Sequence, residues 1–119
     1  MSDKYCLSAG QIMFKSSFDH MAEECHNTAL EKGWWESGRG DGEVIALIHS
    51  ELSEALEGLR HGNPPDDKVP EFTAAEAELA DAIIRIMDFS VHRGFRVAEA
   101  VVAKAEFNKS RQPMHGKKF

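Results

Sequence analysis

Cysteine is scarce in this sequence of 119 residues, and long apolar runs are missing. Its two cysteines, Cys6 and Cys25, form no CxxC pair, so we predict neither a disulfide framework nor a structural zinc site. No segment is apolar for long enough to span a bilayer, and no basic segment precedes an apolar one at the N-terminus. We therefore expect a cytoplasmic protein with two reduced thiols.

Positive charge is also in short supply. The 20 acidic residues outnumber the 14 Lys and Arg, and the net charge is -6. Broad binding to DNA or RNA depends on cations that neutralise phosphates, so this balance argues against polymeric nucleic acid as the main partner. A local excess of Lys and Arg follows Lys104, which suits that end of the chain to a small anion. The length fits one domain over residues 1–119, with a basic tail from about residue 110.

Apolar residues recur at helical spacing, and turn-forming residues separate the periodic segments. This pattern predicts an all-α fold of four helices with no strand. The first helix should begin after Ser8, which has capping-box spacing to Gln11, and end at Gly33. The second should start from an N-cap at Asp41 and end near Gly62. Its expected inward stripe contains Val44, Ile45, Ile48, Leu52, Ala55 and Leu59.

Thr73 and Glu76 repeat the capping-box spacing, so the third helix should begin there and end at Gly94. The C-terminal half of this helix is apolar almost all round. In a domain this small, such a helix lies at the centre of a bundle or at a subunit interface. The fourth helix is expected over about residues 97–109.

Two successive helices each carry a pair of acids at the same spacing, Glu51 with Glu54 and Glu78 with Asp81. Helical residues three apart project toward one spot, and each pair lies at the edge of an apolar stripe. If the two helices pack side by side, all four carboxylates converge, and their repulsion calls for a cation. Hard oxygen ligands favour Mg²⁺, with Mn²⁺ as a substitute. The alternative is a solvated helix face, because a single ExxE is common.

The stretch ALIHSELSEALE at residues 46–57 and the ELAD at 78–81 resemble the ExxE and ExxD motifs of MazG-like nucleotide pyrophosphohydrolases. The KGWW junction at 32–35, the RHGNP turn at 60–64 and the segment from Asn108 to the HGKK at 115–118 are similar to one small, stand-alone branch of that family. The resemblance covers about residues 28–119. It implies a four-helix MazG-like bundle, assembled as a homodimer or a dimer of dimers.

The resemblance also implies an activity, the Mg²⁺-dependent cleavage of a (d)NTP between its α and β phosphates to a (d)NMP and pyrophosphate. The four acids would hold the metal, with Glu51 or Glu54 as the general base. Related alternatives are a dUTPase-like enzyme and a phosphoribosyl-ATP pyrophosphohydrolase of the same superfamily. A non-catalytic helical interaction module is the alternative outside enzymes.

Substrate contacts are expected from two further segments. Lys104, Asn108 and Arg111 follow one another at four- and three-residue intervals and can share a helix face toward the phosphates. The alternative is a basic helix end that complements its own dipole. Lys117 either closes over the site or belongs to a solvated tail.

Trp34 and Trp35 are candidate stacking platforms for the base. Adjacent residues cannot both face the same way, so we expect one ring to pack inward and the other to rim the pocket. The sequence does not indicate which ring does which. Asp88 is expected to pair with Arg85, and the alternative is an outer contact to the acid site.

Overall fold

The computed structural model describes residues 6–111 and 113, and within that part of the chain it contains four helices and no strand. These are α1 (Ala9–Glu31), α2 (Asp41–Arg60), α3 (Ala74–Arg93) and α4 (Val97–Lys109). The predicted all-α class is confirmed, while Lys117 lies outside the described residues. None of the described helices combines the length and the apolar character that a membrane crossing requires.

Both predicted capping boxes are present. The Ser8 hydroxyl accepts the Gln11 N–H at 3.1 Å, and the Thr73 hydroxyl accepts the Glu76 N–H at 3.2 Å. Gly94 ends α3 in the left-handed conformation at φ 69°, as the sequence predicted. One boundary differs, because the N-cap of α2 is Gly40 and Asp41 lies in the first turn. The Asp41 carboxylate there still faces the positive end of the helix dipole.

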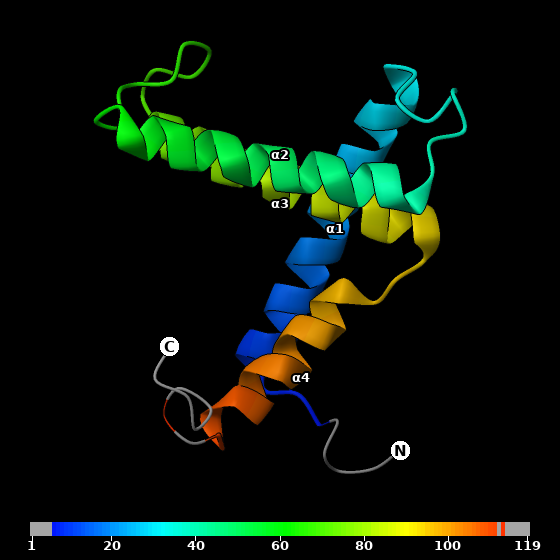
Figure 1. The fold of residues 1–119 in the computed structure, drawn as a ribbon. Helices are drawn as coiled ribbons and strands as arrows, with labels where there is room; N and C mark the ends of the chain where they lie inside the picture. Colours follow the sequence, from blue (N-terminus) through cyan, green and yellow to red (C-terminus); the bar gives the residue numbers. More distant parts are fainter. Residues whose placement is uncertain (1–5, 112, 114–119) are drawn as a thin grey trace.

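The helices form two arms (Figure 1). Helices α2 and α3 lie side by side and run in opposite directions, and α1 crosses α3. Helix α4 returns along the N-terminal half of α1, where the Gln11 side-chain amide donates to the Glu106 carboxylate at 3.0 Å. The α2–α3 pair is therefore one arm, and α1 with α4 extends away from it as the other.

The core of this chain is small. Its central cluster consists of Val44, Ile48, Ala82 and Phe89, against which Trp35 and Ile86 pack. Among the described residues no large side chain is completely buried. The radius of gyration is 16.9 Å, whereas a compact chain of this length has about 13–14 Å. The single chain is thus an open arrangement of helices that do not close around one core.

The inward stripe predicted for α2 is only half correct. Val44, Ile48 and Ala55 are buried, but the other three are exposed, Ile45 by 44%, Leu52 by 46% and Leu59 by 57%. The reason is that, within the described residues, α2 packs mainly on α3, so the apolar residues on its other sides stay largely uncovered. Helix α3 likewise leaves apolar side chains half exposed, namely Leu79, Ile83 and Ile84. The α2–α3 pair thus leaves large apolar side chains of both helices about half exposed.

Helices α2 and α3 approach closely near the loop that joins them. A Cβ at Gly58 would lie 3.0 Å from the Ala74 Cβ, so glycine permits the approach. The Asn63 side-chain oxygen then accepts the Ala75 N–H at 2.9 Å, which ties the loop to the first turn of α3. The acids on the two helices are consequently held in a fixed register.

The cap of α3 should contribute measurably to stability. Replacing Thr73 by Ala leaves the Glu76 N–H without its partner and should lower the free energy of unfolding by about 1 kcal/mol. Urea unfolding at one fixed protein concentration measures the change. Ser50→Ala is a matched control, because the exposed Ser50 hydroxyl only donates back to the Leu47 carbonyl. Equal stability of the two variants would contradict a capping role for Thr73.

Candidate metal centre

Three of the four predicted acids converge. Glu51 and Glu54 in the middle of α2 and Glu78 near the start of α3 each offer one carboxylate oxygen, and these three oxygens all lie within 4.8 Å of one another. Glu51 and Glu78 are partly buried, whereas Glu54 is exposed. We call these three side chains the carboxylate group. It lies at the seam between two antiparallel helices and is open to solvent on the side of Glu54.

Asp81 lies close to the carboxylate group but is not part of it. Burial raises the pKa of Asp81, and the charge of Glu51 raises it further. The cations Arg85 and Lys68 act in the opposite direction on the same pKa. Asp81 therefore shares the electric field of the group, and its role as a metal ligand stays a prediction.

The proximity of the acids changes their proton affinity. The pKa of Glu78 is raised from 4.5 to about 7, first by a hydrogen bond with Glu51 and then by burial and the charges of Glu54, Glu51 and Asp81. Protonated Glu78 can donate to the Glu51 carboxylate, which relieves the repulsion between them. Below about pH 7, a proton thus takes the place that a cation would fill.

The chemistry of the group fits a hard divalent cation. It offers carboxylate oxygens, and no histidine or cysteine of the described residues belongs to it. Mg²⁺ and Mn²⁺ prefer such oxygen ligands, whereas softer metals select imidazole or thiolate. Glu51, Glu54 and Glu78 are the residues that would hold the ion.

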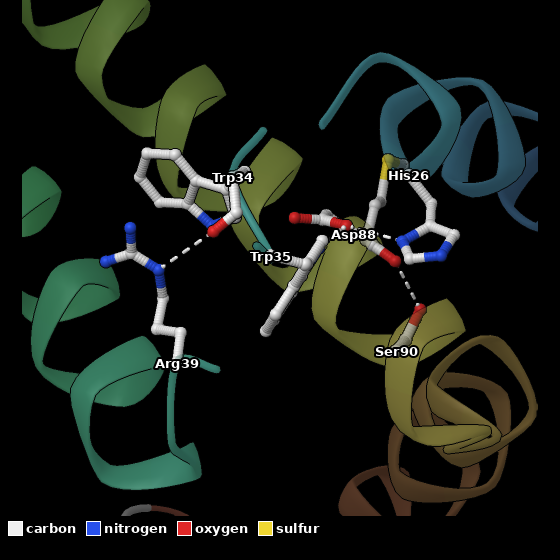
Figure 2. Close-up of polar contacts among 7 residues, drawn as sticks. His26, Trp34, Trp35, Arg39, Asp88 and Ser90 are labelled. Carbon is white, nitrogen blue, oxygen red and sulfur yellow. Dashed lines mark hydrogen bonds and ion pairs between the residues drawn. The ribbon is translucent and has the colours of Figure 1, made fainter. Parts of the chain in front are cut away.

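Arg85 links the carboxylate group to Trp34. The Arg85 Nε donates to the Glu51 Oε1 at 2.9 Å, and the two side chains are only 24% and 12% exposed. The guanidinium carbon of Arg85 lies 4.5 Å from the centroid of the Trp34 ring. Arg39 also contacts this ring at 4.1 Å and donates through Nε to the Trp34 carbonyl at 3.3 Å (Figure 2).

Trp35 points the other way, into the packing between α1 and α3. Its Nε1 donates to the Asp88 carboxylate at 3.0 Å, and the same oxygen lies 2.8 Å from the His26 Nδ1 (Figure 2). The Trp35 ring stacks on His92 with centroids 3.7 Å apart. Trp35 is therefore the ring that packs inward, whereas Trp34 contacts Arg85, the residue that pairs with Glu51.

The predicted Asp88–Arg85 ion pair is wrong. Arg85 pairs with Glu51 on α2, whereas Asp88 pairs with His26 on α1. Residues three apart share a helix face only approximately, and here α3 is packed between two helices. Each of the two side chains finds its partner on a different neighbour.

The predicted phosphate-binding residues lie on the other arm. Lys104 and Asn108 line a shallow apolar hollow of about 410 Å³ on α4, and Arg111 follows that helix. Lys104 and Arg111 both approach the Phe107 ring, at 5.6 and 5.4 Å. Figure 1 shows α4 beside α1, away from the α2–α3 pair that carries the acids. Their contact with phosphate stays a prediction that one chain by itself does not explain.

Two cations near the acids were missed by the sequence analysis. Arg85 lies four residues after Asp81 on α3, and this spacing could have associated it with the acids. Lys68 lies in the loop between α2 and α3, close enough for its charge to lower the pKa of Asp81. No periodic signal identifies a loop residue of this kind.

The raised pKa of Glu78 predicts the pH dependence of stability. Its folded-state pKa of about 7 exceeds the ordinary 4.5, so its contribution is complete below about pH 4.5 and is lost as the pH rises through 7. Without divalent cations, Glu78→Gln should therefore flatten the fall in melting temperature between pH 5 and 8. Thermal unfolding in EDTA measures this difference.

Added Mg²⁺ should reverse the trend, because the cation binds best where Glu78 is ionised. We expect Mg²⁺ to raise the melting temperature more at pH 8 than at pH 5.5. An equal rise at both pH values would contradict competition between the proton and the metal at Glu78.

Comparison with known proteins adds no relative. No protein-family model matches the sequence, and searches of curated proteins and of solved structures found no match. The function therefore has to be inferred from the side chains of this chain.

Proposed function

We propose that the chain is a Mg²⁺-dependent nucleoside triphosphate pyrophosphohydrolase that cleaves a (d)NTP between the α and β phosphates. The observation that carries the proposal is the approach of three carboxylate oxygens, from two helices, within 4.8 Å of one another. Like charges gathered in this way favour a bound cation once Glu78 is ionised, and a triphosphate brings its own Mg²⁺. The resemblance of the motifs to MazG-like enzymes supplies the choice of bond.

The carboxylates provide the binding site and the base. Bound Mg²⁺ would neutralise the phosphate oxygens and lower the pKa of a coordinated water. Glu51, Glu54 and Glu78 would hold the Mg²⁺ at the solvent-exposed edge of the α2–α3 seam. The triphosphate would approach from the side of Glu54, which is the exposed member of the group.

Glu54 is a better general base than Glu51. The Glu51 Oε1 already accepts a hydrogen bond from Arg85, and Glu51 is nearly buried. Among the described residues no cation lies within ion-pair distance of Glu54. In the proposed step, the water oxygen bonds to the α phosphorus while the bond from that phosphorus to the bridging oxygen breaks. Pyrophosphate leaves with the electron pair, and Glu54 takes the proton from the water.

Two cationic side chains and an aromatic ring lie near the carboxylate group. Arg85 contacts Glu51, and Lys68 acts on Asp81, so both are near enough to serve the phosphates. Trp34 lies one side chain away from the carboxylate group and would contact the base through the part of its ring that Arg85 and Arg39 leave free. Lys104, Asn108 and Arg111 would reach a substrate only from the α4 of a second copy.

The exposed apolar faces support a homodimer or a dimer of dimers. Both helices of the acid-bearing arm leave large apolar side chains about half exposed, including Leu52, Leu56, Leu59, Leu79 and Ile83. Covering such side chains contributes about 25 cal/mol per Å² of buried apolar area. A second copy presents the same surface and satisfies a two-fold interface.

A panel of NTPs and dNTPs with Mg²⁺, extended to dUTP and phosphoribosyl-ATP, tests the activity. We expect pyrophosphate release by the parent, and a fall in kcat of about 100-fold or more in Glu54→Gln, the usual effect of losing a general base. Glu57→Gln is the matched control, because Glu57 lies one turn further along α2 and pairs with Arg60. It should stay within twofold of the parent.

Two results would count against the proposal. One is the absence of pyrophosphate with every nucleotide in the presence of Mg²⁺, which would favour a non-catalytic interaction module. The other is full activity of Glu54→Gln, which would contradict the assignment of Glu54 as the general base. Preference for dUTP or phosphoribosyl-ATP would assign the chain to a related branch with the same chemistry.

Light scattering after size exclusion tests the assembly. The parent should elute as a dimer or tetramer at micromolar concentration, and Ile83→Glu should shift it toward the monomer because a charge would be buried in the interface. Leu30→Glu is the matched control, since Leu30 is equally exposed but lies at the end of α1. A monomeric parent would refute the assembly.

A further inference from the structure

Arg85 contacts two groups to which the proposed function gives separate tasks. One is the Glu51 carboxylate, a metal ligand, which accepts the Arg85 Nε–H at 2.9 Å. The other is the Trp34 ring, the candidate base platform, whose centroid lies 4.5 Å from the guanidinium carbon. One planar group on α3 thus joins α2 to the junction between α1 and α2.

The two contacts of Arg85 can influence each other. The ion pair has little exposure, 24% for Arg85 and 12% for Glu51, so solvent screens it weakly. A guanidinium also holds its place on an aromatic face through charge and stacking. Because the guanidinium is a rigid plane, a displacement at Glu51 also displaces the group that lies against Trp34.

Arg39 provides an internal comparison. Its guanidinium contacts the same Trp34 ring, at 4.1 Å, but its ion pair is with Glu43 in the first turn of α2. Arg39 therefore supports the ring without touching the carboxylate group. Of the two arginines on Trp34, Arg85 is the one that connects the ring to a proposed metal ligand.

We propose that Arg85 is a positioning residue that makes the Trp34 ring respond to cation occupancy at the carboxylate group. A divalent cation bound by the Glu51 carboxylate would compete with Arg85 for its negative charge and would repel the guanidinium. The Arg85–Glu51 bond weakens, and the contact of Arg85 with Trp34 changes. Since coupling of this kind is reciprocal, a ligand stacked on Trp34 also alters the affinity for the metal.

The inference rests on the proposed function, so its test separates the two. Mg²⁺ binding is measured by the rise in melting temperature, and the response of the ring by the change in tryptophan emission during the same Mg²⁺ titration. In the parent we expect both. Trp34→Phe should keep the thermal rise and lose the emission change, which assigns the signal to Trp34 rather than Trp35.

Arg85→Lys is the decisive variant. Lysine keeps the positive charge beside Glu51 but has no planar group to lie against the ring. We expect this variant to keep the thermal rise and to lose most of the emission change. Arg39→Lys is the matched control and should retain the emission change. Far-UV circular dichroism without Mg²⁺ checks that each variant folds.

Each remaining outcome is decisive. Two outcomes overturn the coupling but leave the cation site intact, provided that Mg²⁺ still raises the melting temperature. One is an unchanged emission response in Arg85→Lys, and the other is the lack of an emission response in the parent. Loss of the response in Arg39→Lys as well as in Arg85→Lys shows that the ring merely needs support, and this also overturns the coupling. Absence of thermal stabilisation in the parent rejects the cation site and the inference with it.

Discussion

Repulsion among carboxylates at the α2–α3 seam is the constraint on which the rest of this structure depends. The helices approach closely at Gly58, and their register brings Glu51, Glu54 and Glu78 within 4.8 Å. Such a gathering costs free energy unless charge is removed or balanced. Two features offset the cost within the chain, namely the proton that Glu78 retains up to about pH 7 and the guanidinium of Arg85. A divalent cation would offset it more completely.

Helix α3 organises the site because it is packed on two sides. Arg85 turns toward α2 and holds Glu51, while Asp88 turns toward α1 and binds His26 and Trp35. The two tryptophans consequently have different contacts. Trp35 packs between α1 and α3 and binds Asp88, whereas Trp34 contacts Arg85, the partner of Glu51. A structural anchor and a candidate substrate platform thus occupy adjacent positions in the sequence.

The open shape of the chain is the other consequence of its size. The four helices of the described residues bury one small core, and the α2–α3 arm leaves apolar side chains about half exposed. A domain this small buries a limited share of its apolar surface, so covering these faces in the proposed assembly would add to its stability. The same openness leaves Lys104, Asn108 and Arg111 on the arm opposite the carboxylate group, so the phosphate contacts proposed for them depend on assembly.

The sequence by itself determined the helices, their caps and the pairing of acids, because capping boxes, glycine stops and three-residue spacings are local signals. The Ser8 and Thr73 caps followed from such signals, whereas the sequence predicted that four acids converge and the packing of α2 on α3 brings together Glu51, Glu54 and Glu78. Only the tertiary structure decided the rest. The helix that lies opposite each side chain decides its contacts. It decides that Arg85 binds Glu51, that Trp34 rather than Trp35 contacts Arg85, and that Leu52 and Leu59 stay exposed. No spacing along the chain encodes this.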